Sequence, residues 1–130
     1  MRQFPAFFNL RGQRVVIVGG GEEAVRKARL LVSAEAVPVI LVRSTVILTR
    51  MEEALAKACV IQPIWRLEEA LKTARLAIVA EDNPKAIDLI RAAGVPLNVV
   101  DRPELCDFTI PSIIDRGDVV AAIGTNGTSP

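Results

Sequence analysis

The chain has 130 residues, of which 51% are hydrophobic and 4% aromatic, and its formal net charge is +1. This size suits one compact domain over residues 1–130, and the near-neutral charge gives no reason to expect nucleic acid or a membrane surface as a partner. No apolar run approaches the ~20 residues of a membrane-spanning helix, and the absence of histidine removes the commonest general base and metal ligand.

The N-terminal segment of residues 2–11 contains Phe4, Phe7 and Phe8 and lacks the features of a signal peptide. We expect this segment to be extended and packed on the edge of a sheet. The two cysteines are too few for a disulfide framework, so we expect reduced thiols and a cytoplasmic protein.

Strand and helix patterns alternate over most of the chain. Strands are expected at residues 13–18, 37–42, 59–62, 76–80 and 97–100. Helices are expected at residues 22–33, 45–58, 67–74 and 84–93, the last with Asp82 or Asn83 as N-cap and Gly94 as C-cap. Cys59 is expected in the core, and Trp65 is expected to be a packing residue.

Near the end of the chain the pattern changes to two successive strands, at residues 108–115 and 119–123. The linking residues 115–118 read Asp-Arg-Gly-Asp, which is typical of a hairpin. The sequence therefore predicts an α/β, Rossmann-type fold: a mostly parallel sheet with helices on both faces and a C-terminal β-hairpin.

The first strand runs directly into Gly19, Gly20 and Gly21, and Ala24 completes a G-x-G-x-x-A pattern at the start of a helix. Gly19 allows a sharp turn, and Gly21 lets a pyrophosphate approach the backbone. The pyrophosphate would lie on the free N–H groups at the helix start. This context favours a dinucleotide site over a purely structural turn.

The second strand lacks the acidic residue that usually binds the ribose of NAD, and ends instead at Arg43 and Ser44. Arg43 could meet the 2′-phosphate of NADP, stack on adenine, or be a solvated loop residue. Glu81 ends the fourth strand, near the cofactor in this topology. The residues alone leave the choice between NAD and NADP open.

Asp101 follows the fifth strand at the carboxyl end of the predicted sheet, where ligands bind in such folds. A carboxylate there could accept a proton while a hydride leaves to a nicotinamide, or it could simply end the strand before Pro103. Cys106 lies nearby, and a small buried cysteine is its simplest interpretation.

Several motifs together resemble siroheme synthase N-terminal domains, a family of precorrin-2 dehydrogenases of which some are also sirohydrochlorin ferrochelatases. The resemblance is carried by Phe4-Pro5, Leu10-Arg11-Gly12, Val18-Gly19-Gly20-Gly21, Arg26-Lys27-Ala28-Arg29-Leu30-Leu31, Asn98-Val99-Val100-Asp101, Phe108, Pro111-Ser112-Ile113-Ile114-Asp115-Arg116 and Gly127-Thr128-Ser129-Pro130. These motifs are colinear with the family and extend over nearly the whole chain.

The resemblance implies oxidation of precorrin-2 to sirohydrochlorin with NAD, and in bifunctional members insertion of ferrous iron, as a substrate, to give siroheme. It implies that Asp101 is the catalytic residue. It also implies two sets of contacts and no resident metal. Cofactor contacts carried over from the family fall on Gly19, Gly20, Gly21, Glu22, Glu23, Arg43 and Ser44, and we add Glu81 from its position after the fourth strand. Tetrapyrrole contacts are expected at Arg102 and Arg116, whose charge suits the substrate's carboxylates, and at Pro111, Ser112, Thr125 and Asn126.

Two departures from the family pattern stand out. Members continue past Thr-Ser-Pro into a helical region that supports dimerisation and covers the substrate, and we expect that part to be absent or truncated after Pro130. The usual Gly-Ala before the second strand is also missing. The homodimer is therefore an expectation for the full-length family. A non-catalytic NAD(P)-binding sensor is the alternative function, and a structural remnant that binds neither ligand is a third.

Overall fold

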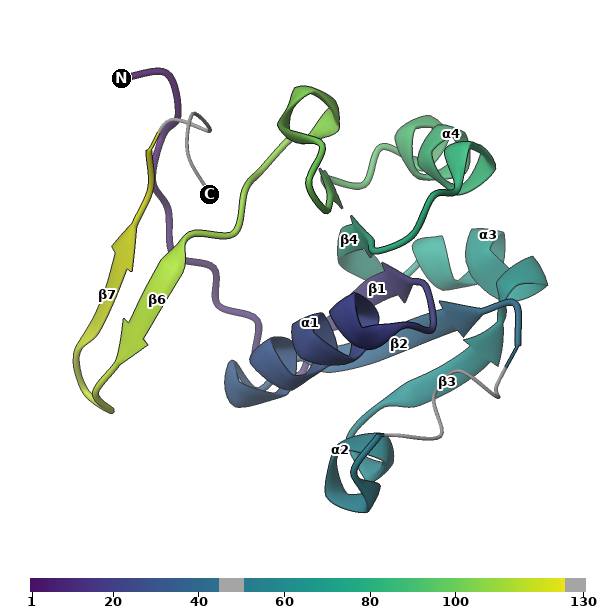
Figure 1. Ribbon diagram of the computed structural model, residues 1–130, viewed down its shortest axis with the longest axis horizontal. Helices are drawn as coiled ribbons and strands as arrows, with labels where there is room; N and C mark the ends of the chain where they lie inside the picture. The colour runs from purple at the N-terminus through teal and green to yellow at the C-terminus, as the bar shows by residue number, and fades with distance from the viewer. Residues whose placement is uncertain (45–50, 126–130) are drawn as a thin grey trace.

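The computed structural model describes residues 1–44 and 51–125, and a five-stranded parallel sheet forms its centre (Figure 1). The strands lie in the order β3-β2-β1-β4-β5, and every pair is parallel. Their bounds are β1 (Arg14–Val18), β2 (Val37–Val42), β3 (Val60–Pro63), β4 (Ala74–Val79) and β5 (Leu97–Val99).

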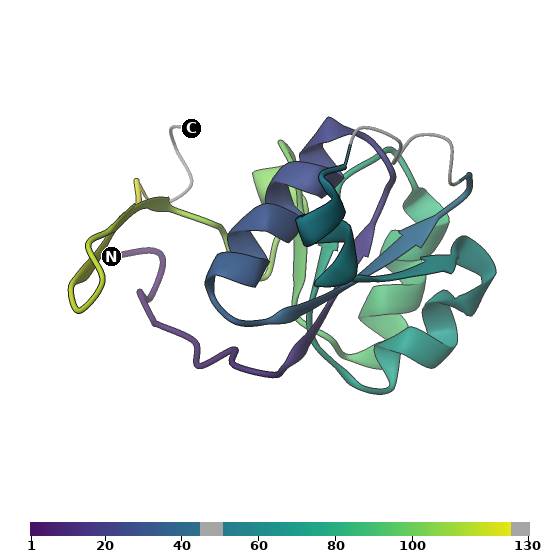
Figure 2. The same ribbon diagram turned by 90° about the horizontal axis from the view of Figure 1, so that it is seen from below.

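Helices cover both faces of this sheet, as predicted (Figures 1 and 2). They are α1 (Glu22–Ser33), α2 (Glu53–Lys57), α3 (Leu67–Leu71) and α4 (Pro84–Ala93), with short 3-10 turns η2 (Ile64–Arg66) and η3 (Pro103–Leu105). Ala24, Ala28 and Leu31 of α1 pack on one face, whereas α3 and α4 pack on the other.

The central strand β1 shows why the sequence folds this way. Val15 and Ile17 face α1, whereas Val16 and Val18 face α3 and α4, and all four are fully buried. A strand covered on both faces needs apolar residues at successive positions, and β-branched side chains fit the pleated surface. The strand is expected at residues 13–18 and is observed at Arg14–Val18, so its C-terminal end is as predicted and it begins one residue later.

Helix α4 begins and ends at the residues that the sequence predicts. The Asn83 side chain accepts a hydrogen bond from Ala86 N at 3.1 Å, and Pro84 occupies the first turn. Gly94 ends the helix with φ +73°, in the left-handed region that glycine adopts without steric cost.

The chain order reverses at β1, which lies between β2 and β4. In an open parallel sheet this switch point opens a crevice at the carboxyl ends of the strands, where ligands bind. The turn after β1, the end of β2 and the end of β4 all meet at this point.

The last two strands form a separate antiparallel hairpin, β6 (Ser112–Asp115) and β7 (Val120–Ile123). At its tip, Asp115 Oδ1 accepts a hydrogen bond from Gly117 N at 2.9 Å, and Gly117 has φ +79°. Both strands are exposed along their length, and the hairpin lies apart from the main sheet in both views (Figures 1 and 2).

The segment between β5 and the hairpin is attached to the sheet by hydrogen bonds. Asn98, which is 7% exposed, donates from Nδ2 to the Phe108 carbonyl at 3.0 Å. The Asp107 carboxylate accepts from Leu97 N at 3.0 Å, and Asp107 N donates to the Leu97 carbonyl. The connection from the sheet to the hairpin is therefore held against β5 at Asp107 and Phe108.

The prediction for the N-terminal segment is wrong. Phe4 and Phe7 are 82% and 73% exposed, so they do not pack on the sheet edge. The segment runs beside the hairpin instead (Figures 1 and 2), and Gln3 Nε2 donates to Thr109 Oγ1 at 3.1 Å. The two edge strands β3 and β5 are only four and three residues long.

Other differences are local. Trp65 is 77% exposed rather than packed, and Cys59 is half-buried just before β3 rather than inside it. The expected strand at 108–115 is regular only from Ser112, because residues 108–111 belong to the connection. Helix α3 ends at Leu71, and β4 begins two residues early, at Ala74. Of the helix expected at 45–58, residues 45–50 lie outside the described residues.

Within the described part of the chain, no helix is long and apolar enough to cross a membrane.

We expect Asn98→Ala to lower the free energy of unfolding by about 1–3 kcal/mol, because the Phe108 carbonyl loses its partner in a partly buried place. Urea unfolding measures this change. Asn9→Ala, at an exposed position, is the control and should change stability by less than about 0.5 kcal/mol. Equal stability of both variants would contradict the anchoring role of Asn98.

Candidate functional site

The glycine turn joins β1 to α1 and lies against β4. Gly19 has φ +134°, and a Cβ at this position would lie 3.2 Å from the carbonyl oxygen of Ala80. Gly19 N donates to Leu41 O at 3.0 Å, and Ala80 N donates to Val18 O at 2.8 Å. Glycine is therefore required here both by the backbone conformation and by the close approach of the next strand.

Gly21 is the N-cap of α1, and a Cβ added there would meet no atom within 4 Å. No residue caps this helix with a side-chain hydrogen bond, so its first N–H groups, at the positive end of the helix, have no side-chain cap. An open, uncapped helix start beside a buried glycine turn fits the pyrophosphate of a dinucleotide. The residues present therefore fit the predicted cofactor.

Glu22 and Glu23 occupy the first turn of α1, as predicted. Glu22 is exposed, whereas the carboxylate of Glu23 pairs with Arg26 and lies 4.0 Å from Lys27 Nζ. The Glu23 carboxylate is therefore paired with basic side chains of the same helix.

Arg43 and Glu81 follow the two strands that flank β1, and their side chains form an ion pair. Arg43 Nε and Nη2 lie 3.0 and 2.9 Å from Glu81 Oε2, and Nη2 also donates to the Asp82 carbonyl at 3.0 Å. Asn83 Nδ2 donates to the same Glu81 oxygen at 3.2 Å. Two predicted cofactor residues are thus brought together from strands on either side of the glycine turn, and Ser44 is exposed beside Arg43.

Asp101 occupies a tight turn after β5. Arg102 N donates to the Val99 carbonyl at 3.1 Å, and Asp101 has φ +63°, as the third residue of such a turn often does. Aspartate tolerates this left-handed conformation better than most residues. The Asp101 side chain is exposed at the carboxyl edge of the sheet, on the same edge as the glycine turn.

The Cys106 side chain forms hydrogen bonds with the backbone of this turn. Its Sγ accepts from Val99 N at 3.2 Å and lies 3.3 Å from the carbonyl oxygens of Val99 and Arg102. Burial raises the pKa of the Cys106 thiol, so the proton needed to donate to a carbonyl is retained at neutral pH. The half-buried position agrees with the simple structural interpretation.

Arg102, next in the chain, is exposed and pairs with Glu104, with Arg102 Nε 2.6 Å from Glu104 Oε1. The hydrogen bond from this guanidinium lowers the pKa of the Glu104 carboxyl. Arg102 therefore offers a positive charge beside Asp101 that is already partly neutralised.

The predicted tetrapyrrole contacts are divided between two parts of the molecule. Arg102 lies beside Asp101, whereas Pro111, Ser112, Arg116 and Thr125 belong to the hairpin or its ends. The hairpin lies apart from the main sheet (Figure 1), so the described residues do not bring the two groups together. Asn126 lies outside the described residues.

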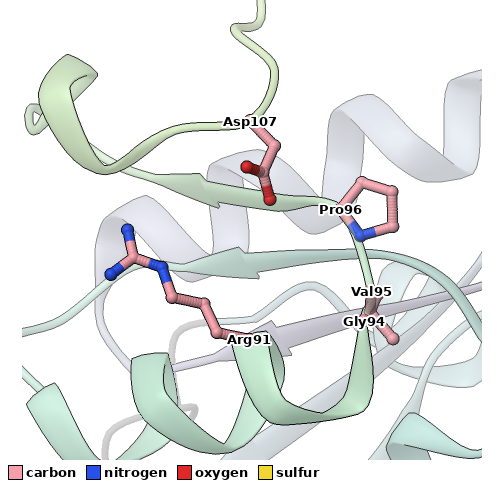
Figure 3. Close-up of a pocket in the computed structure, with 5 residues that line it drawn as sticks. All are labelled: Arg91, Gly94, Val95, Pro96 and Asp107. Carbon is pink, nitrogen blue, oxygen red and sulfur yellow. The ribbon is translucent and has the colours of Figure 1, made fainter.

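A hollow of about 370 Å³ lies elsewhere, between the end of α4 and the start of β5 (Figure 3). It is lined by Arg91, Gly94, Val95, Pro96 and Asp107. Its two charged side chains already have structural partners, since Arg91 donates to the Leu105 carbonyl and Asp107 accepts from Leu97 N. This hollow is at the opposite end of β5 from Asp101 and is separate from the glycine turn.

No cluster of three or more cysteine or acidic side chains that could hold a metal ion occurs among residues 1–44 and 51–125.

Sequence reasoning missed two contacts of this site. One is the approach of the Ala80 carbonyl to Gly19, and the other is the hydrogen bond from Asn83 to Glu81. The approach of Ala80 to Gly19 follows from the pairing of β1 with β4, which no local pattern specifies. Asn83 carries a clear N-cap signal, but its second contact, with Glu81, depends on the turn between β4 and α4.

Comparison with known proteins bears directly on this site. A family model described as putative NAD(P)-binding matches residues 6–112. Siroheme synthase of Nitrosomonas europaea is 37% identical over 140 residues, covering 100% of this chain and 28% of the relative. That of Azotobacter vinelandii is 39% identical over 145 residues, covering 100% and 29%. The chain thus spans less than a third of the length of these curated relatives.

Among solved structures, the chain is similar to one described as SirC, precorrin-2 dehydrogenase. The TM-score is 0.73 at 19% sequence identity, with 98% of this chain and 64% of that chain covered. This likeness supports the Rossmann-type fold with its C-terminal hairpin.

We expect Gly19→Ala to destabilise the protein by about 1–3 kcal/mol, because the new Cβ meets the Ala80 carbonyl in a strained backbone conformation. Gly21→Ala should leave stability within about 0.5 kcal/mol, since the space there is open, but should weaken NAD(P) binding. Thermal unfolding and calorimetric titration measure the two effects. If Gly21→Ala binds NAD(P) as well as the wild type, the pyrophosphate is not at this turn.

We expect Cys106→Ala to cost about 1–3 kcal/mol, because Val99 N loses its partner in a half-buried place. Cys106→Ser should cost less, because a hydroxyl keeps both donor and acceptor capacity. Urea unfolding of both variants, with Cys59→Ala as the matched control, measures the difference. Equal losses for alanine and serine would show that the thiol acts through packing alone.

Proposed function

The chain belongs to the putative NAD(P)-binding family whose model it matches, and we propose that it oxidises precorrin-2 to sirohydrochlorin with NAD as hydride acceptor. The siroheme synthase relatives match the chain over its whole length, which supports this pathway. One juxtaposition carries the proposal: the glycine turn and Asp101 lie at the same carboxyl edge of one parallel sheet.

The residues that would hold the dinucleotide surround the switch point. Gly19 and Gly21 keep the backbone open above the start of α1, and its N–H groups would bind the pyrophosphate. Arg43 and Glu81 lie beside the turn on the two flanking strands. A bound nicotinamide would supply the acceptor for the hydride.

Asp101 is the proposed catalytic residue. Loss of a hydride from precorrin-2 must be accompanied by loss of a proton, and the exposed carboxylate of Asp101 is the group proposed to accept it. The turn that Cys106 fastens limits the movement of Asp101, which keeps the carboxylate at the crevice. Orientation of this kind is a main source of rate enhancement.

The charged groups of the tetrapyrrole need cationic partners. Arg102, next to Asp101, is the nearest candidate in sequence, and Arg116 on the hairpin is a second. Pro111, Ser112, Thr125 and Asn126 complete the proposed substrate contacts. Since the hairpin lies apart from the sheet, a bound substrate or a second copy of the chain would have to bring these groups toward Asp101.

A homodimer that works in the cytoplasm is part of the proposal. The hairpin exposes Ile113, Ile114, Val120 and Ile123, and an isolated two-stranded hairpin is marginally stable, which supports burial of this surface in an assembly. The two cysteines are free thiols, in keeping with a reducing compartment.

Iron insertion would be a separate step, in which ferrous iron as a substrate replaces two pyrrole protons of sirohydrochlorin. Asp101 is the carboxylate proposed to accept these protons one at a time and to release each of them to water. Siroheme formation from sirohydrochlorin and ferrous iron, followed by its absorbance, tests this activity independently of NAD.

We expect the wild-type protein to form NADH from precorrin-2 and NAD under anaerobic conditions, and Asp101→Ala to be slower by about 100-fold or more. Asp101→Asn keeps the side-chain shape and the turn while removing the proton acceptor, so it should be equally slow. Asp88→Asn removes an exposed carboxylate of α4 that is proposed neither to react nor to bind the substrate, and it is the control. Wild-type rates in both Asp101 variants would contradict the role of this residue, and NAD binding without turnover in the wild type would favour the sensor.

A further inference from the structure

The ion pair between Arg43 and Glu81 crosses the crevice in which the dinucleotide is proposed to bind. Arg43 follows β2, Glu81 follows β4, and β1 lies between these strands. Glu81 Oε1 lies 3.5 Å from the Cβ position of Gly19, so the carboxylate is seated directly against the glycine turn. The pair therefore joins the two sides of the switch point.

The carboxylate is the more firmly held partner. The Glu81 side chain is 25% exposed, compared with 59% for Arg43. Glu81 Oε2 accepts from Arg43 Nε, Arg43 Nη2 and Asn83 Nδ2. Because Asn83 also caps α4, one of the groups that positions Glu81 is itself fixed by the helix.

This arrangement changes what Arg43 can do. A free arginine at the end of the second strand would attract the 2′-phosphate of NADP through a charge-assisted bidentate contact. Here Nε and Nη2 already face a carboxylate. A phosphate reaching Arg43 would therefore also come close to the negative charge of Glu81.

We propose that Glu81 determines the preference for NAD over NADP, a role that rests on the proposed dinucleotide site. Its carboxylate provides the acceptor for a ribose hydroxyl that an acidic residue at the end of the second strand usually provides. The same carboxylate repels a 2′-phosphate and occupies the arginine that would otherwise bind it. The acidic residue therefore follows β4 here instead of β2, and Arg43, which follows β2, forms an ion pair with it.

Calorimetric titration of the wild type and Glu81→Gln with NAD and with NADP tests this role, without tetrapyrrole or turnover. Glutamine removes the charge but can still accept from Asn83. We expect the ratio of NADP to NAD affinity to rise about tenfold or more, because a like charge near the phosphate is removed and Arg43 is released. An unchanged ratio would overturn the inference.

Arg43→Gln provides a second, opposite test. With the guanidinium gone, Glu81 is no longer neutralised, so the ratio of NADP to NAD affinity should fall below that of the wild type. In the double variant Glu81→Gln with Arg43→Gln, the gain in NADP affinity should disappear. A gain that persists without Arg43 would overturn the proposed link between the two residues.

Glu52→Gln is the matched control, because it removes one carboxylate from an exposed ion pair with Arg29 that does not contact the glycine turn. The ratio of NADP to NAD affinity in this variant should equal that of the wild type. A rise in the ratio as large as that in Glu81→Gln would overturn a specific role for Glu81. Binding of neither dinucleotide by the wild type would overturn the cofactor site itself, and this inference with it. Binding of both with an unchanged ratio in Glu81→Gln overturns only the inference.

Discussion

The close approach of Gly19 to the Ala80 carbonyl is the contact on which the site depends. Parallel pairing of β1 with β4 brings the turn after β1 against the end of β4, and only a residue without a Cβ fits there in this backbone conformation. The same approach places Glu81, the residue after Ala80, beside the turn. Sheet packing and the proposed cofactor chemistry are therefore set by one backbone contact.

Patterns within a few residues predicted the fold well, because local forces determine those features. The buried run of β1, the caps of α4 and the hairpin tip each follow from residue types at adjacent positions. The failures have a different cause. Phe4, Phe7 and Trp65 are apolar, but residue type alone does not reveal whether the folded chain offers a surface that covers them, and here all three are exposed.

The sequence indicated which residues lie near the candidate site, but not which of their side chains contact one another. The glycine turn and Asp101 were located by motif and by their position after a strand. The contact between Arg43 and Glu81 joins residues 38 positions apart and depends on strand order, which local patterns do not specify. The interpretation of Arg43 as a phosphate ligand or a solvated residue stayed open for that reason, because the partner that decides its charge lies on another strand.

The turns beside β1 and β5 place two different demands on the backbone. Gly19 must lack a side chain because another strand occupies the space, whereas Asp101 has a positive φ but projects its side chain into solvent. A left-handed turn with Asn or Gly at the same position would fold as well, so stability does not require a carboxylate there. Cys106 and the turn hydrogen bond from Arg102 N to the Val99 carbonyl then fix the backbone on which the carboxylate is carried. Stability alone therefore does not require an acidic group at position 101, and the proposed proton transfer at the crevice would give that group a purpose.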